Sequence, residues 1–185
     1  DEPLEIAQTL HQGNILIYTV GIGDEVDKKE LLEIATDQSN SYHVNSYTSV
    51  KDIKNSLLGR VCTDARMKDE CDASNTDVMF LLDGSSSVGE KNFGIAKNFI
   101  TNITQRFEIT SGKIRVGLVQ YGTKPNTEIE LGSTKKILDL EEEIQGVKWK
   151  YGDTMTAEAL RHTYNEMIKR KGKSRKRAVI VITDG

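Results

Sequence analysis

Hydrophobic positions in the first third of the chain predict helices and strands in alternation. Apolar residues recur at helical spacing over 4–10, and the mostly apolar stretch at 14–20 is typical of a buried strand. A helix is expected from Asp27, a short strand at 41–44 and a further helix from about Ser49. Because helices and strands alternate, this part of the chain favours a parallel sheet.

The remainder of the chain continues the pattern. Its expected elements, in order, are a strand at 78–82, a helix at 90–107, a strand at 113–121, a short strand at 127–131, helices at 135–147 and 154–168, and a strand at 178–183. Apolar and polar residues alternate at 127–131, as they do in an exposed edge strand. We therefore predict an α/β fold: a doubly wound, mostly parallel sheet with one antiparallel edge strand and helices on both faces.

The apolar run at 78–82 ends in side chains that carry oxygen. Asp83 follows it directly, Gly84 permits a tight turn, and Ser85 and Ser87 come at alternate positions after that. A carboxylate and two hydroxyls that converge in such a turn form the oxygen-only ligand set that hard divalent cations such as Mg²⁺ prefer. The alternative is that one of the serines merely caps the helix that follows.

Two later stretches offer further oxygen ligands. Gly-Asp-Thr-Met-Thr at 152–156 opens a helix, and a second apolar strand ends in Ile-Thr-Asp-Gly at 182–185. Together with Asp-Gly-Ser-Ser-Ser at 83–87, and in this order, the three stretches resemble the metal-ion-dependent adhesion site of the von Willebrand factor type A domain.

The resemblance implies a role for each matching residue. In the family, hydroxyl groups bind Mg²⁺ directly, aspartates act largely through water, and an open coordination position accepts an acidic residue of a partner. The resemblance therefore implies a site for Mg²⁺ or Mn²⁺ made by Asp83, Ser85, Ser87, Thr154 and Asp184. The second motif departs from the family's common pattern, because Asp153 stands where glycine or asparagine is usual and Glu158 where glycine is frequent. Both departures add negative charge.

The order of the segments differs from that of a single domain of this family. Residues 18–23, Tyr-Thr-Val-Gly-Ile-Gly, resemble a strand end in the family's C-terminal half, yet they precede the metal motif. We expect residues 1–62 to be the C-terminal half of one domain, 63–71 a linker, and 72–185 the N-terminal half of the next. This organisation resembles a tandem array in a matrix protein of the collagen VI or matrilin type. We also expect the two halves to pack together as one circularly permuted domain.

The chain has two cysteines, Cys62 and Cys71, on either side of a polar stretch. With so few cysteines and no Cys-x-x-Cys motif, a zinc site is not expected. In the family a disulfide often joins the two ends of a domain. The resemblance thus implies that Cys62 and Cys71 pair with each other in a permuted domain, or with cysteines outside the chain in an intact array.

Composition limits the classes of function. The 185 residues, 37% hydrophobic and 29% charged, suit a globular protein with one substantial core. A net charge of −3 gives no general case for a nucleic-acid partner. No apolar run approaches the about 20 residues of a membrane span, so no membrane insertion is expected. No signal peptide opens the chain, which fits a segment of a longer protein.

One stretch is strongly basic, with seven cations in nine residues: Lys169, Arg170, Lys171, Lys173, Arg175, Lys176 and Arg177. A solvated loop between a helix and a strand is the expected interpretation, and attraction of an anionic polysaccharide is the alternative. A sequon that begins at Asn102 is compatible with N-glycosylation and with a secreted protein.

These observations favour a non-enzymatic adhesion or protein-binding module of a secreted matrix protein. Its expected partners are extracellular matrix proteins or cell-surface receptors. One alternative is a spacer domain whose metal site is silent. Another is an Mg²⁺-dependent phosphatase or hydrolase, but no second aspartate follows Asp83 closely, no base lies near the motifs and no phosphate-binding Gly-x-x-x-x-Gly-Lys occurs.

Overall fold

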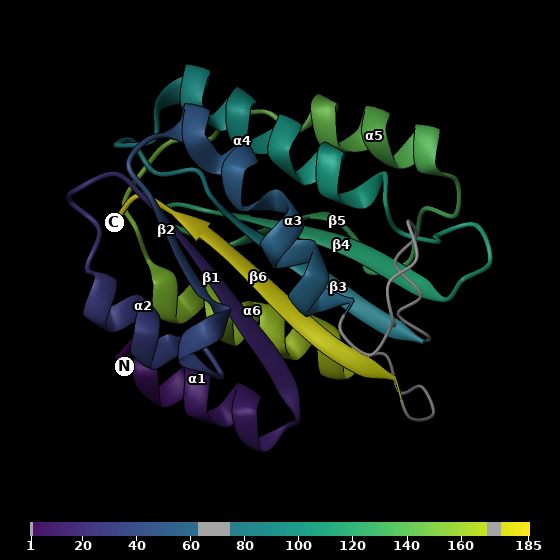
Figure 1. Cartoon of the computed structure of the whole chain (residues 1–185), viewed down its shortest axis with the longest axis horizontal. Coiled ribbons are helices and arrows are strands. Elements are labelled where there is room, and N and C mark those ends of the chain that lie inside the picture. The colour runs from purple at the N-terminus through teal and green to yellow at the C-terminus, as the bar shows by residue number, and fades with distance from the viewer. Residues whose placement is uncertain (1, 63–74, 170–174) are drawn as a thin grey trace.

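A computed structural model describes residues 2–62, 75–169 and 175–185 (Figure 1). Its strands are β1 (Ile15–Ile22), β2 (Ser41–Val44), β3 (Thr76–Asp83), β4 (Ile114–Tyr121), β5 (Asn126–Ile129) and β6 (Lys176–Thr183). Its α-helices are α1 (Pro3–Gln12), α2 (Lys28–Ile34), α3 (Val50–Val61), α4 (Gly89–Thr104), α5 (Ile137–Gly146) and α6 (Thr156–Lys169). The elements follow the predicted order along the chain.

The six strands form one sheet in the order β2-β1-β6-β3-β4-β5. All neighbouring strands are parallel except β5, which runs antiparallel to β4 at the edge of the sheet. Helices cover both faces of the sheet (Figure 1). The predicted fold class is therefore confirmed.

Alternate residues of the central strands enter two separate hydrophobic cores. In β3, Val78, Phe80 and Leu82 face a core that also contains side chains of α3, α4 and α5. Met79 and Leu81 of the same strand face the other core, which α1, α2 and α6 complete. Every residue of β3 is buried. This explains why the strand reads as an unbroken apolar run: a strand covered on both faces has no side that must be polar.

The segments before and after the undescribed stretch 63–74 share one sheet. β1 pairs with β6 from Ile15 to Gly21, and β6 pairs with β3 on its other side. β6 thus lies between β1, from the first segment, and β3, from the second. The origin of the two segments in neighbouring domains stays a prediction.

Local signals set several element ends. Asp27 caps α2, because its side chain accepts hydrogen bonds from the backbone N–H groups of Lys29 and Glu30. Helix α4 ends at Thr104, earlier than the apolar spacing predicted, and Phe107 packs into the core from the turn that follows. A helical spacing of apolar residues therefore continued past the end of the helix itself.

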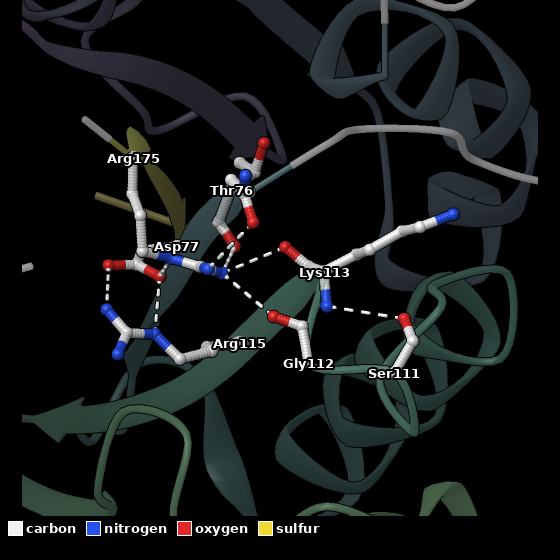
Figure 2. A network of polar contacts seen from close by, with 8 residues as sticks. Thr76, Asp77, Ser111, Gly112, Lys113, Arg115 and Arg175 are labelled. Atoms are coloured by element: carbon white, nitrogen blue, oxygen red, sulfur yellow. Dashed lines mark hydrogen bonds and ion pairs between the residues drawn. The ribbon is translucent and has the colours of Figure 1, made fainter. Parts of the chain in front are cut away.

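At the end of the sheet where the parallel strands begin, two arginines bond to the buried carboxylate of Asp77. The side chain of Asp77 in β3 is 2% exposed. Arg115 of β4 donates to both of its oxygens, from Nε at 2.7 Å and from Nη2 at 2.6 Å, and Arg175 donates from Nε at 2.6 Å (Figure 2). The two guanidinium groups thus compensate a charge that burial alone would make very unfavourable.

Arg175 extends this network into the neighbouring backbone. Its Nη2 group donates to the carbonyl oxygens of Thr76 at 3.1 Å, Gly112 at 3.3 Å and Lys113 at 2.8 Å (Figure 2). Because Arg175 directly precedes β6, the network joins three adjacent strands, β6, β3 and β4, at one end of the sheet.

We predict that Asp77→Asn lowers the free energy of unfolding by about 2–4 kcal/mol, because both guanidinium groups lose their carboxylate while staying partly buried. Urea unfolding at neutral pH measures the change. The matched control is Glu33→Gln, which removes an exposed ion pair with Lys29 and should change stability by less than about 1 kcal/mol. Equal effects of the two substitutions would contradict the assignment.

Candidate metal centre

The opposite end of the sheet brings two aspartates together. β3 and β6 are neighbouring parallel strands, and Asp83 and Asp184 lie where they end. The Thr183 hydroxyl donates to Oδ2 of Asp83. Sites form readily at the carboxyl ends of parallel strands, because the following loops diverge there.

The loop between β3 and α4, called the first loop below, links both aspartates through its serines. The backbone N–H of Ser85 donates to Oδ1 of Asp83 at 2.8 Å. The hydroxyls of Ser85 and Ser87 lie 3.0 Å apart, and Ser87 donates to Oδ1 of Asp184 at 2.8 Å. Four of the five predicted ligand residues therefore form one hydrogen-bonded cluster.

The capping alternative for these serines does not hold. Helix α4 has Val88 at its N-cap position, and no side chain caps it. The hydroxyls of Ser85 and Ser87 are turned toward each other and toward Asp184 instead. Their place in the sequence just before a helix is thus explained by the cluster rather than by the helix.

Thr154, the fifth predicted residue, lies half-buried in a loop that is held against the serines. The N–H of Ser86 donates to the carbonyl of Gly152 at 2.8 Å, and the N–H of Gly152 donates back to the Ser86 hydroxyl at 3.1 Å. This reciprocal pair fixes the second loop beside the first, with Thr154 two residues further along. All three predicted motifs therefore meet at one end of the sheet.

Burial makes the two carboxylates difficult to ionise. Asp83 is 1% exposed, and its desolvation raises its pKa, although hydrogen bonds from Thr183 and Ser85 oppose the rise. Desolvation also raises the pKa of Asp184, against the hydrogen bond from Ser87. The negative charge of Asp184 contributes further to the raised pKa of Asp83. Asp83 thus lacks the water that would stabilise its charge, and half-buried Asp184 lacks part of it.

These residues fit a hard divalent cation. Within the part of the chain that the structure describes, neither Asp83 nor Asp184 forms an ion pair with a lysine, arginine or histidine. The described residues also hold no group of three histidines, cysteines or acidic residues suited to a metal. Serine and threonine hydroxyls would therefore complete the ligand set, and oxygen ligands suit Mg²⁺ or Mn²⁺.

Sequence reasoning missed the residues that support the first loop. Gln120 of β4 is 1% exposed and donates from Nε2 to the carbonyl of Lys148 at 2.9 Å, while its Oε1 accepts from the N–H of Lys150 at 2.9 Å. A Cβ atom on Gly84 would come within 2.5 Å of that Oε1. Trp149 donates to the carbonyl of Ser85 at 3.2 Å. The one signal available was a glutamine near the end of a largely apolar strand.

Two buried tyrosines lie close to the carboxylates. Burial raises the pKa of Tyr47, and the negative charges of Asp184 and Asp83 add to the rise. The fully buried Tyr121 shows the same direction of pKa shift, caused by burial and then by Asp83. Tyr47 comes from the first segment of the chain, so both segments shape the surroundings of the cluster.

The other residues singled out from sequence lie elsewhere. Asn102 is exposed on α4, and Cys62 follows α3, whereas Cys71 lies outside the described residues, as do Arg170, Lys171 and Lys173. Lys169 pairs with Glu166, and Lys176 and Arg177 begin β6. Arg175 is bonded to Asp77, as described above, so its guanidinium is not presented to solvent as part of a basic surface. No helix among the described residues has the length and apolar character to cross a membrane.

Comparison with known proteins agrees with the arrangement of these motifs. The family model described as the von Willebrand factor type A domain matches residues 1–56 and 77–185. The human collagen alpha-6(VI) chain is 29% identical over 187 aligned residues, which include all of this chain and 8% of the collagen chain. Human vitrin is 30% identical over 181 aligned residues, covering 93% of this chain and 27% of vitrin. The chain thus spans only a small part of either relative.

A solved structure has the same fold. Proximal thread matrix protein 1 of the mussel byssus, described with a zinc-occupied MIDAS motif, superposes with a TM-score of 0.58 at 24% identity. The superposition covers all of this chain and 47% of the mussel protein. The family model, the three motifs and the sheet order agree, and the chain belongs to the von Willebrand factor type A domain family.

Proposed function

We propose that this domain is a non-enzymatic adhesion module that binds a divalent cation, Mg²⁺ or Mn²⁺. The observation that carries the proposal is a pair of carboxylates, buried Asp83 and half-buried Asp184, joined through serine hydroxyls, for which the described residues provide no basic partner. The ligand residues would be Asp83, Ser85, Ser87, Thr154 and Asp184. A bound cation would supply positive charge to the two carboxylates and an open position for a carboxylate of a partner.

The ligand residues would have different roles in binding the cation. Serine and threonine hydroxyls would contact the cation, and the aspartates would act largely through water. Thr183 and the N–H of Ser85 hold the Asp83 carboxylate in place. Because such partners of ligating groups orient the ligands, their loss typically weakens metal binding 10- to 100-fold. The zinc in the MIDAS motif of the mussel protein is a related precedent in the same fold.

Relatives support a location in the extracellular matrix. Collagen chains and vitrin are among the similar proteins, and we infer that this domain is secreted and that its partners are matrix proteins or cell-surface receptors. We also infer that its two segments derive from neighbouring domains of an array. The spacer function remains the second candidate, because a formed site need not be used.

A hydrolase is less well supported. His43 bonds through Nε2 to the carbonyl of Gly23, and His162 bonds through Nε2 to the Thr127 hydroxyl. Neither hydrogen bond joins the serine and aspartate cluster. Activated serine nucleophiles usually have a histidine or lysine as their base, and no hydrogen bond from such a residue to the cluster is found among the described residues.

We predict that Mg²⁺ stabilises the domain through Asp83. At 100 times the dissociation constant, the ion should raise the free energy of unfolding by about 2.7 kcal/mol, and Asp83→Asn should weaken binding at least about 10-fold. Calorimetric titration and thermal melting, with and without chelator, measure both effects. The matched control is Asp52→Asn on the exposed side of α3, which should bind Mg²⁺ like the unaltered chain. A folded chain that binds no Mg²⁺ or Mn²⁺ would favour the spacer function.

The raised pKa values of Asp83 and Asp184 predict a specific pH dependence. Without metal, each group adds stability below its unfolded pKa of about 3.9, and that contribution is lost as pH rises through the higher folded pKa. Asp83→Asn should therefore reduce the loss of metal-free stability between acid and neutral pH. Urea unfolding in chelator across this range measures it. Identical pH profiles for the two proteins would refute the prediction.

Mg²⁺ affinity should change with pH in the opposite direction. Because cation binding requires ionised carboxylates, affinity should increase with pH until both aspartates have lost their protons. Their raised pKa values place this increase at a higher pH than for exposed aspartates. Calorimetric titrations over a series of pH values measure the position of the increase.

A further inference from the structure

Tyr151 has a backbone conformation that its side chain disfavours. Its φ is +48°, in the left-handed region. Among the described residues other than glycine, the two with a similar φ are Asn14 and Asn75. Asparagine tolerates this region because its short side chain bonds locally, whereas a bulky side chain there is a clear outlier. Glycine would fit the position better than tyrosine.

The surroundings hold Tyr151 in this conformation. The N–H of Lys150 bonds to Gln120, and Gly152 exchanges two hydrogen bonds with Ser86. A Cβ atom on Gly122 would lie 2.6 Å from the carbonyl oxygen of Tyr151, so the two backbones are in close contact. Strain that the structure fixes so firmly is characteristic of functional positions.

The Tyr151 ring is exposed and packs against a neighbouring aromatic ring. The residue is 68% exposed, yet its ring meets that of Trp149 edge to face, with centroids 5.8 Å apart and an interplanar angle of 64°. Trp149 in turn bonds to the carbonyl of Ser85 in the metal loop. Met155, 40% exposed, lies in the same loop as Tyr151. Rigid aromatic side chains of this kind are common anchors of protein interfaces, since binding orders them at little cost.

A groove lined in part by an exposed lysine lies beside the Tyr151 ring. Its walls include Tyr151, Lys124, Asn126 and Lys150. Lys150 is paired with Glu128, whereas Lys124 is exposed and forms no ion pair with any residue in the described ranges. The groove therefore combines an aromatic surface with a positive charge available to an acidic ligand.

We propose that Tyr151 and Lys124 form the contact surface for an extended, acidic, proline-containing peptide segment of the partner. One carboxylate would complete the coordination of the cation, a neighbouring proline would pack on the Tyr151 ring, and a second carboxylate would pair with Lys124. Proline-containing segments are already extended and dock well on aromatic-lined grooves. This inference rests on the proposed cation site.

The first experiment compares stability in chelator. If Tyr151 serves binding rather than folding, Tyr151→Gly removes strain, and its melting temperature should be unchanged or up to about 3 °C higher. Asn14→Gly is the matched control, an exposed left-handed residue at the other end of the sheet, and it should behave similarly. A clear drop in the melting temperature of Tyr151→Gly would overturn the proposal, because tyrosine would then be stabilising the fold.

The second experiment measures binding of a short fluorescent peptide of alternating glutamate and proline, in Mg²⁺ and in chelator. The unaltered chain and Asn14→Gly should bind it in Mg²⁺ and release it in chelator, and a glutamine–proline peptide should not bind. Tyr151→Gly should weaken binding at least about 10-fold, and Lys124→Glu several-fold, while calorimetry finds Mg²⁺ affinity retained in both.

The outcomes separate this inference from the cation site. Peptide binding that is equally strong in Tyr151→Gly would refute the role of the tyrosine. Mg²⁺ binding without any peptide binding would refute the class of partner and leave the cation site intact. Absence of Mg²⁺ binding in the unaltered chain would remove the cation site, and the present inference with it.

Discussion

The structure depends on the parallel pairing of β3 with β6. This pairing places Asp83 and Asp184 at the same end of two buried neighbouring strands, where Asp83 is buried, Asp184 is half-buried, and neither forms an ion pair with a basic side chain among the described residues. Such an arrangement is unfavourable for the metal-free protein. The glycine at 84, the glutamine beneath it and the loop around Gly152 all serve to hold the two carboxylates and the hydroxyls in register.

The two ends of the sheet differ in whether basic side chains compensate their carboxylates. At one end, Asp77 is compensated by two guanidinium groups that are bonded on several sides. At the other end, compensation is incomplete within the described protein. The first end stabilises a fixed geometry for the three central strands, and the second holds Asp83 and Asp184 where the proposed cation would bind. Proteins often place such stability deficits at functional sites.

Much of the fold followed from sequence because burial determines the pattern of β3 and β6, and Asp27 carries its own cap signal. The three motifs likewise identified the loops that meet, through their resemblance to a known family. What sequence could not supply were contacts made only by tertiary packing. Trp149 gives no sign in the sequence that it bonds to Ser85. Arg175 looked like one member of a basic run, and its partner Asp77 lies far away in the chain at the start of an apolar strand.

The position of β6 between β1 and β3 has a kinetic consequence. Both neighbours precede β6 in the chain, so until β6 is available each presents an unpaired, largely apolar edge. Contacts between residues so distant in sequence form slowly, because a large loop must close before they contribute any stability. During synthesis on a ribosome, this sheet therefore cannot close until β6 emerges, and Asp83 and Asp184 can come together only after that step.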